Sequence, residues 1–240
     1  MILVLAGTSE GRLAAVSLEK EGLEVIASTA TTYGGELLAK DFKGEITARP
    51  LTFAEMVQLI TDKKIDKVID ATHPFAVEVS NNVREACQVK NVTYERLERT
   101  GEEYVEDEGM FKAKDVEEAV LLASEMEGKI TGNIFLATGS SKLEYYVASL
   151  DPEKLVVRIL PVKESLEKCL ELGLSPKNII AMQGPFDEKI NRCLFKRYKA
   201  SLLITKDSGP TGGTKEKIDA AKGLNIPVIL IERPGKVISL

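Results

Sequence analysis

The chain opens with MILVLAGTSEGRLAAVSL, residues 1–18, the stretch that decides the fold. Its first six residues are apolar, which is typical of a buried strand. Gly7, Thr8 and Ser9 then interrupt the apolar run, and apolar side chains recur at helical spacing as far as Leu18. We therefore predict a strand, a glycine turn and an amphipathic helix in direct succession.

The glycine turn is suited to a diphosphate group. A glycine at a strand end lets the backbone approach a phosphate, and Thr8 and Ser9 offer hydroxyl and amide donors at a helix N-terminus. Ser9 and Arg12 occupy the second and third glycine positions of the G-x-G-x-x-G pattern. An ordinary helix start capped by Thr8 or Ser9 is the alternative. The predicted cofactor-binding residues of this turn are Gly7, Thr8, Ser9 and Glu10.

Apolar runs alternate with segments of helical period along the whole chain. Strands are predicted in the first half at residues 2–6, 24–28, 45–48, 67–70 and 93–96, with helices beginning near Ser9, Tyr33, Thr52 and Pro74. In the second half they are predicted at 134–136, 155–158, 178–182, 202–204 and 228–231, with helices beginning near Val116, Leu143, Glu164, Glu188 and Lys215. Such alternation predicts βαβ units and mostly parallel sheets.

An acidic stretch without helical period, residues 100–109, separates the two halves. We predict an α/β protein with two Rossmann-like lobes, each a mostly parallel sheet flanked by helices. The N-terminal lobe is residues 1–99 and the C-terminal lobe residues 100–240, with 100–114 as the connection. The ligand is expected in the cleft between the lobes, outside the carboxyl ends of the strands.

Composition excludes several classes of partner. A formal net charge of −5 argues against nucleic acid. No apolar run approaches the length of a membrane span, and the apolar start lacks the flanks of a signal peptide, so no membrane partner is expected. Cys87, Cys169 and Cys193 lack metal-ligand spacing and are predicted to be buried free thiols of a cytoplasmic protein. The sequence shows no heptad repeat and no obvious apolar patch. The oligomeric state is therefore left open, and a monomer is one of the states that fit.

The segment DATHPF, residues 70–75, contains the one histidine of the chain. Pro74 suits the first turn of a helix, and the residue before a proline is extended, so His73 should project at the strand edge. A structural role for His73 is the alternative to an acid–base role. The second strand ends in Ser28 and Thr29, where dinucleotide folds commonly bear an acid, and these hydroxyl groups could accept a 2′-phosphate.

Three loops of the second half could contact a ligand. They are ATGSSK at 137–142, MQGPF at 182–186 and TKDSGPTGGTKEK at 205–217. The third combines glycines, hydroxyl groups and cations before a helix, which favours a nest for an anionic group. Tight turns and a flexible lid are the structural alternatives for these loops.

Four segments in register resemble the precorrin-6A reductase family: LAGTSE at 5–10, DATHPF at 70–75, GPF at 184–186 and TKDSG at 205–209. Their order and the total length also match. The resemblance implies an enzyme of cobalamin biosynthesis that reduces one double bond of a tetrapyrrole-derived corrin precursor, precorrin-6A or cobalt-precorrin-6A, with NADPH or NADH. Ala6 and Gly11 depart from residues that the family often has, and neither change should block phosphate binding.

The resemblance implies a substrate with many carboxylate side arms. A protein with a net negative charge needs local cations to bind them. We predict His73 and Lys206 as catalytic, no metal ligands, and Ser28, Thr29, Gly139 and Ser140 as further cofactor-binding residues. The predicted substrate-binding residues are Arg12, Arg49, Thr72, Lys142, Gly184, Pro185, Phe186, Ser208 and Lys217.

Two other functions stay open at this point. One is another NAD(P)-dependent oxidoreductase that uses the same first turn. The Tyr-x-x-x-Lys pair of short-chain dehydrogenases is absent, since Ser149 stands four residues after Tyr145. The other is a two-lobed sensor that binds a nucleotide or a small anion.

Overall fold

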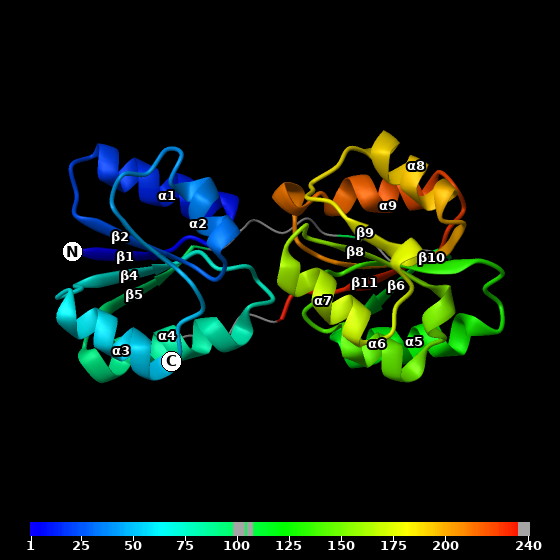
Figure 1. Cartoon of the computed structure of the whole chain (residues 1–240), viewed down its shortest axis with the longest axis horizontal. Helices are drawn as coiled ribbons and strands as arrows, with labels where there is room; N and C mark the ends of the chain where they lie inside the picture. Colours follow the sequence, from blue (N-terminus) through cyan, green and yellow to red (C-terminus); the bar gives the residue numbers. More distant parts are fainter. Residues whose placement is uncertain (98–103, 105–107, 235–240) are drawn as a thin grey trace. The chain divides into compact units, whose positions relative to one another are not determined.

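The computed structural model of the chain describes residues 1–97, 104 and 108–234. It divides into two compact units, Met1–Arg99 and Thr100–Leu240. In the described part of each unit, a parallel sheet carries helices on both faces (Figure 1). This confirms the predicted α/β class with two Rossmann-like sheets. No helix within the described ranges is long and apolar enough to cross a membrane.

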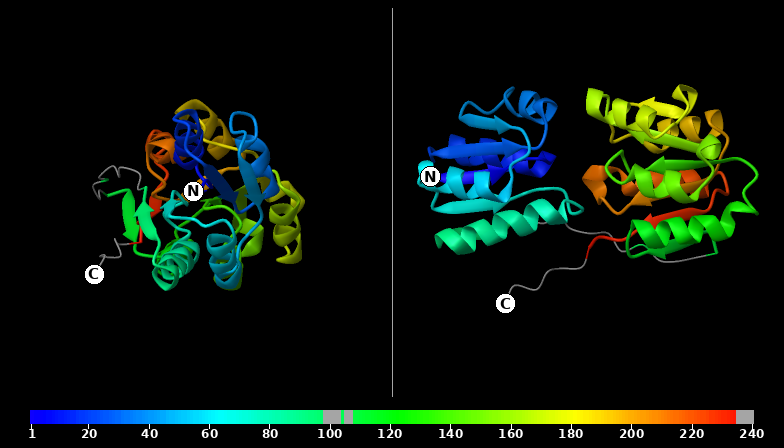
Figure 2. Two further views of the ribbon diagram at one scale, coloured as in Figure 1. Left: turned by 90° about the vertical axis from the view of Figure 1, so that its left-hand side faces the viewer. Right: turned by 60° about the horizontal axis from the view of Figure 1, so that its bottom comes forward.

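Unit 1 is a doubly wound sheet. Its strands are β1 (Ile2–Leu5), β2 (Val25–Thr29), β3 (Glu45–Ala48), β4 (Lys67–Asp70) and β5 (Thr93–Arg96). Its helices are α1 (Ser9–Lys20), α2 (Thr32–Leu38), α3 (Phe53–Asp62) and α4 (Val77–Lys90). The strands pair in parallel in the order β3-β2-β1-β4-β5. Right-handed crossovers place α1 and α2 on one face of the sheet and α3 and α4 on the other (Figures 1 and 2).

The β1 strand shows why this sequence forms a central strand. Leu3 packs with Met56 of α3, whereas its neighbour Val4 packs with Ala15 of α1. Successive side chains of a strand point to opposite faces of the sheet. A strand that is covered on both faces therefore needs an uninterrupted apolar run, which is what the chain begins with.

Unit 2 has the same architecture with a longer sheet. Its strands are β6 (Met110–Ala113), β7 (Asn133–Ala137), β8 (Leu155–Ile159), β9 (Ile179–Ala181), β10 (Ala200–Lys206) and β11 (Val228–Ile231). Its α-helices are α5 (Val116–Glu127), α6 (Leu143–Ser149), α7 (Lys163–Glu171), α8 (Glu188–Arg197) and α9 (Thr214–Lys222). The order β6-β11-β10-β7-β8-β9 is parallel throughout. Helices α8 and α9 cover one face, and α5, α6 and α7 the other (Figure 1).

The strand β6 was not predicted. It lies within residues 100–114, which the sequence indicated as a connection, and it pairs with β11 at the edge of the sheet. Its four residues include Lys112 and directly follow the acidic stretch, so their pattern does not stand out. Most of the acidic stretch itself, residues 100–103 and 105–107, lies outside the described residues.

Helix α4 begins three residues later than predicted. The backbone N–H of Ala76 donates to the carbonyl of His73 at 2.8 Å, and Ala76 has φ −88° and ψ 49°, which is not helical. Pro74 therefore belongs to a separate turn, and the first helical residue is Val77.

One cysteine prediction was wrong. Cys87 and Cys169 are buried free thiols, but Cys193 is exposed. Helix α8 buries Asn191 and Phe195, which lie four residues apart on one face. Cys193 falls midway between them and so points away from the sheet.

Gly11 lies where α1 approaches the end of β1. A Cβ at this position would come within 2.9 Å of Ala6 Cα and within 2.9 Å of Ala71 Cβ. Only glycine permits such a close approach of helix and sheet. Gly11 thus takes the packing role of the third glycine in dinucleotide-binding turns, one position before Arg12.

Gly11→Ala is expected to lower the free energy of unfolding of unit 1 by about 1–3 kcal/mol, because the added methyl group overpacks this contact. Gly7→Ala is the matched control. A Cβ at Gly7 would meet no atom within 4 Å and Gly7 has no positive φ, so its effect should stay within about 0.5 kcal/mol. Chemical denaturation followed by circular dichroism measures both. An unchanged midpoint for Gly11→Ala would contradict the close contact.

Candidate functional site

The strand order of each sheet reverses at one point. In unit 1 the reversal lies between β1 and β4, and in unit 2 between β7 and β10. Ligands of open parallel α/β sheets bind outside the carboxyl ends of the strands at such a point. We call the turns that follow β1 and β4 the unit 1 edge, and the turns that follow β7, β8, β9 and β10 the unit 2 edge.

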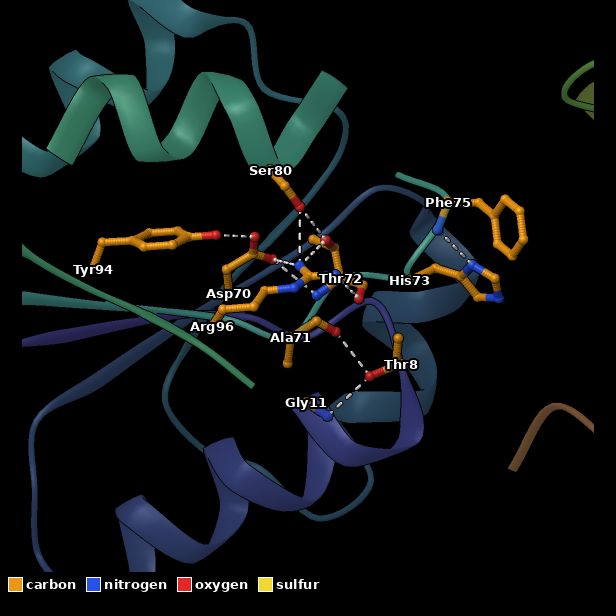
Figure 3. A network of polar contacts seen from close by, with 10 residues as sticks. All are labelled: Thr8, Gly11, Asp70, Ala71, Thr72, His73, Phe75, Ser80, Tyr94 and Arg96. Atoms are coloured by element: carbon orange, nitrogen blue, oxygen red, sulfur yellow. Dashed lines mark hydrogen bonds and ion pairs between the residues drawn. The ribbon is translucent and has the colours of Figure 1, made fainter. Parts of the chain in front are cut away.

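Thr8 joins the two turns of the unit 1 edge (Figure 3). It is the N-cap of α1, where its hydroxyl oxygen accepts the backbone N–H of Gly11 at 3.1 Å. The same hydroxyl group donates to the carbonyl of Ala71 at 2.8 Å. Gly7, one residue earlier, is exposed and has open space around it. The turn therefore presents a fixed helix N-terminus with room beside the backbone for an anionic group.

A partly buried ion pair supports the turn that follows β4. Asp70 is fully buried, and its Oδ1 lies 2.6 Å from Arg96 Nη1. The hydroxyl group of Tyr94 donates to Asp70 Oδ2 at 2.8 Å, and the backbone N–H of Thr72 donates to Asp70 Oδ1 at 3.0 Å. Arg96 also donates to the hydroxyl oxygens of Thr72 and Ser80, at 2.8 Å and 2.9 Å. Figure 3 shows that this network surrounds the start of the 72–76 turn.

The network keeps Asp70 charged. Burial opposes ionisation, but the hydrogen bond from Thr72 and the charge of Arg96 outweigh it and hold the pKa of Asp70 below its usual value. Burial and the nearby Asp70 raise the pKa of Tyr94, so that Tyr94 remains a protonated donor. The hydroxyl group of Thr72 is engaged inside this network, and its predicted contact with substrate stays a prediction.

His73 follows Thr72 at the unit 1 edge. Its Nδ1 accepts the backbone N–H of Phe75 at 3.3 Å, and the two rings lie 5.7 Å apart. In the neutral imidazole the remaining proton is therefore on Nε2. The turn holds the ring half-buried in one orientation, as a donor of a hydrogen bond or a proton requires.

The other residues predicted for unit 1 lie outside this network. Ser28 and Thr29 are buried at the end of β2, and Thr29 Oγ1 donates to the carbonyl of Thr31 at 3.0 Å. Arg49, after β3, forms an exposed ion pair of 2.6 Å with Glu55. The ligand contacts of Ser28, Thr29 and Arg49 stay predictions, as do those of Ser9, Glu10 and Arg12 on the first turn of α1.

The TKDSG segment leaves β10 as a closely bonded turn. Thr214 Oγ1 accepts the backbone N–H of Ser208 at 3.0 Å and donates to the carbonyl of Lys206 at 3.2 Å. The carboxylate of Asp207 pairs with Arg233 at 3.0 Å. These contacts fix the backbone of Lys206 and Ser208 at the unit 2 edge.

The loop after β9 packs against this turn. Gly213 has φ 63°, and a Cβ there would lie 3.1 Å from Pro185 Cβ. The guanidinium group of Arg158, on β8, lies over the ring of Phe186, with 5.2 Å between the guanidinium carbon and the ring centroid. The predicted residues Gly184, Pro185 and Phe186 therefore belong to the same edge as the TKDSG turn.

Four cationic side chains come from the elements of the unit 2 edge: Lys142, Arg158, Lys206 and Lys217. Burial, together with the charge of Lys142, lowers the pKa of Lys206. Burial and the charge of Arg158 lower the pKa of Lys217 to about 7, although Glu216 and Asp207 act in the opposite direction. A net acidic protein thus gathers positive charge at this edge.

The turn after β7 completes the unit 2 edge. Gly139 has φ 75°, which glycine adopts without strain, and a Cβ there would meet no atom within 4 Å. The hydroxyl group of Ser140 donates to Ser165 of α7 at 3.0 Å. Lys142 Nζ lies 5.2 Å from the ring centroid of Tyr145. The predicted cofactor contacts of Gly139 and Ser140 stay predictions.

Sequence reasoning missed two sets of residues. Asp70 and Arg96 are register partners on β4 and β5, and each is a charge that ends a strand. Arg158 interrupts the buried run of β8 and is bonded to the buried Asn191 of α8 at 3.1 Å. The available signal in both cases was a charged residue within or at the end of a predicted strand.

Comparison with known proteins gives one consistent result. A family model described as "Precorrin-6x reductase CbiJ/CobK" matches residues 1–239. The "Cobalt-precorrin-6A reductase" of Priestia megaterium is 39% identical over 238 residues, which cover 98% of this chain and 91% of that protein. The "Precorrin-6A reductase" of Rhodococcus erythropolis is 27% identical, with 97% and 89% coverage. The solved structure "CobK precorrin-6A reductase" superposes with a TM-score of 0.74 at 26% identity, covering 98% of this chain and 88% of that chain.

Arg96→Met is expected to lower the free energy of unfolding at neutral pH by about 3–5 kcal/mol, since it leaves Asp70 buried without its counter-charge. Adding Asp70→Asn should recover part of this loss, because the uncompensated charge is then gone. In the wild type, folding depresses the pKa of Asp70. The stability that its charge contributes is therefore fully present above the pKa of the unfolded state and is lost as the pH falls through the pKa of the folded state.

In the Arg96→Met protein the deficit should instead shrink as the pH falls towards 4, because protonation neutralises Asp70. Urea denaturation at several pH values measures these differences. A deficit that does not depend on pH would show that Arg96 contributes by packing alone.

Proposed function

The chain belongs to the precorrin-6x reductase CbiJ/CobK family, and from this premise we propose that it reduces cobalt-precorrin-6A with a nicotinamide cofactor. The family predicted from four sequence motifs is confirmed, and with it an oxidoreductase of cobalamin biosynthesis that acts on a CH–CH group. Five relatives named cobalt-precorrin-6A reductases share 32–39% identity with the chain and a sixth shares 24%, whereas two named precorrin-6A reductases share 27% each. The higher identity of the first five favours the cobalt-bearing substrate.

The unit 1 edge fits the diphosphate of the cofactor. The observation that supports this assignment is the open, exposed backbone at Gly7 beside the N-terminus of α1, which Thr8 holds in place. Backbone amides and the helix dipole favour an anionic group there. We assign Gly7, Thr8 and Ser9 to the diphosphate. No carboxylate ends β2, where Ser28 and Thr29 stand, so both NADPH and NADH are compatible with this edge.

The unit 2 edge fits the acidic arms of the macrocycle. One of its cations, Lys206, lies in the TKDSG segment that resembles the family, and the hydrogen bonds of this turn fix the backbone of Lys206. Lys142 and Lys206 are close enough for their charges to interact, which favours binding of a carboxylate between or beside them. We assign Lys142, Lys206 and Ser208 to the substrate.

The bound cofactor supplies a hydride, and a proton completes the reduction of one carbon–carbon double bond. The protein's own residues orient the reactants and provide that proton. Lys206 is suited to donate it, because burial and the charge of Lys142 lower its pKa and so make its proton easier to release. The Nε2 proton of His73 is the second donor, and the Phe75 contact fixes its direction.

We place the reaction in the cytoplasm, where reduced nicotinamide cofactors are available. The three free cysteines support this placement because an oxidising compartment would expose the thiol of Cys193 to disulfide formation.

The purified protein should oxidise NADPH or NADH only when cobalt-precorrin-6A is present. Absorbance of the reduced cofactor, with each cofactor titrated separately, gives the preference, and precorrin-6A is the matched substrate that lacks cobalt. Absence of substrate-dependent oxidation with either cofactor and either macrocycle would refute the proposed activity.

Gly7→Ala should raise the KM for the cofactor by about 10-fold or more, since a methyl group occupies the space assigned to the diphosphate. Because the same variant leaves the fold undisturbed, the KM for the macrocycle should stay within about twofold. Steady-state kinetics with each reactant varied in turn separates the two effects. An unchanged KM for the cofactor would show that the diphosphate does not bind at this turn.

A further inference from the structure

Arg158 occupies an unusual position for a charged residue. It stands in β8 between the buried Val157 and Ile159, with its side chain under the loop that follows β9. Its Nη1 donates to Asn191 Oδ1 at 3.1 Å. Asn191 is itself fully buried and donates to the carbonyls of Phe186 and Asp187, at 3.1 Å and 2.9 Å. The amide of Asn191 is therefore fixed as an acceptor, and Arg158 is held in one direction.

Lys217 is buried beside this group. Only 4% of the residue is exposed, and its Nζ donates to the carbonyl of Gly212 at 3.2 Å. Gly213, the next residue, rests on Pro185 of the Phe186 loop. The two cations thus share one set of loops, and Arg158 is close enough for its charge to act on Lys217.

Neither cation has an ion-pair partner within the described part of the chain. Asp207, a carboxylate whose charge acts on Lys217, pairs with Arg233 at 3.0 Å. Glu216 is the second carboxylate whose charge acts on Lys217. Its Oε2 is buried without a hydrogen-bond partner and lies beyond ion-pair distance of Lys217. Lys217 is buried and Arg158 is half-buried. Cations that are withdrawn from water and repel each other are unfavourable unless an opposite charge compensates them.

We propose that Arg158 and Lys217 together form a binding site for one oxyanion, a carboxylate or a phosphate group, at the unit 2 edge. Arg158 offers the planar donor fork that matches an oxyanion, and Lys217 offers the remaining protons of its ammonium group. Phe186 supports the face of the guanidinium. The site is inferred from unit 2 alone, and only the identity of its occupant depends on the proposed function.

Two sources can supply this oxyanion. One is a carboxylate arm of the macrocycle, and the other is a phosphate of the cofactor. An oxyanion also favours the charged form of Lys217, whose pKa is about 7 in its absence. Binding should therefore weaken as pH rises above 7, by up to about tenfold per pH unit. The groups that face Lys217 are Arg158, Glu216 and Asp207, and of these only the two carboxylates oppose the binding of an anion.

Calorimetric titration with sulfate and with acetate, which keep their charge between about pH 6 and 9, tests the site without turnover. Wild type should bind at least one of them, more weakly as pH rises. Lys217→Met, a buried apolar replacement of similar length, should lose about 10-fold or more in affinity and the pH dependence with it. Arg158→Gln keeps a donor for Asn191 and should lose affinity while keeping the fold. Lys189→Met on the exposed side of α8 is the control.

Kinetics of the same variants identify the occupant. A KM raised only for the macrocycle indicates a carboxylate arm, and a KM raised only for the cofactor indicates a phosphate. The proposal would be overturned if sulfate and acetate each bound to Lys217→Met and Arg158→Gln as tightly as they bind to wild type. A protein that binds sulfate through Lys217 but shows no reductase activity would keep this site and refute the proposed function instead.

Discussion

Parallel pairing with right-handed crossovers is the constraint on which the rest of this structure depends. It requires every connection to pass over a face of the sheet, and it lets the strand order reverse only where two neighbouring strands send their helices to opposite faces. In unit 1 these strands are β1 and β4, and in unit 2 they are β7 and β10. The turns after β1, β4, β7 and β10 lie at these two reversals, where the helices diverge and leave the strand ends uncovered.

The two edges differ in whether their charged side chains are paired. At the unit 1 edge, Asp70 is matched by Arg96 and by donors from Tyr94 and Thr72, so the ion pair is complete before any ligand binds. At the unit 2 edge, the half-buried Arg158 and the buried Lys217 have no ion-pair partner among the described residues. The first arrangement fixes the shape of a turn, and the second favours the binding of an anion.

Much of the fold could be predicted because both sheets are covered on both faces. A central strand such as β1 must then be apolar throughout, and each of the ten strands that the sequence predicted is present. The edge strand β6 escaped prediction because it is short and contains Lys112. Helix α4 was placed too early because the turn at His73 uses backbone hydrogen bonds that side-chain periodicity does not reveal.

The site was less predictable because its key contacts join distant positions. The sequence indicated the glycine turn but left open whether it caps a helix or holds a diphosphate. The structure shows that Thr8 is a cap, which leaves the exposed backbone at Gly7 available for a ligand. The packing role of Gly11 depends on Ala71, and the pairing of Asp70 depends on Arg96. No local pattern records such tertiary contacts.

The hydroxyl group of Thr8 has a mechanical consequence for unit 1. Because one oxygen atom both caps α1 and donates to the carbonyl of Ala71, the glycine turn and the turn that follows β4 are linked through a single side chain. A displacement of α1 therefore strains the contact with the segment that leads to His73. This link constrains the spacing between the exposed backbone at Gly7 and the imidazole of His73.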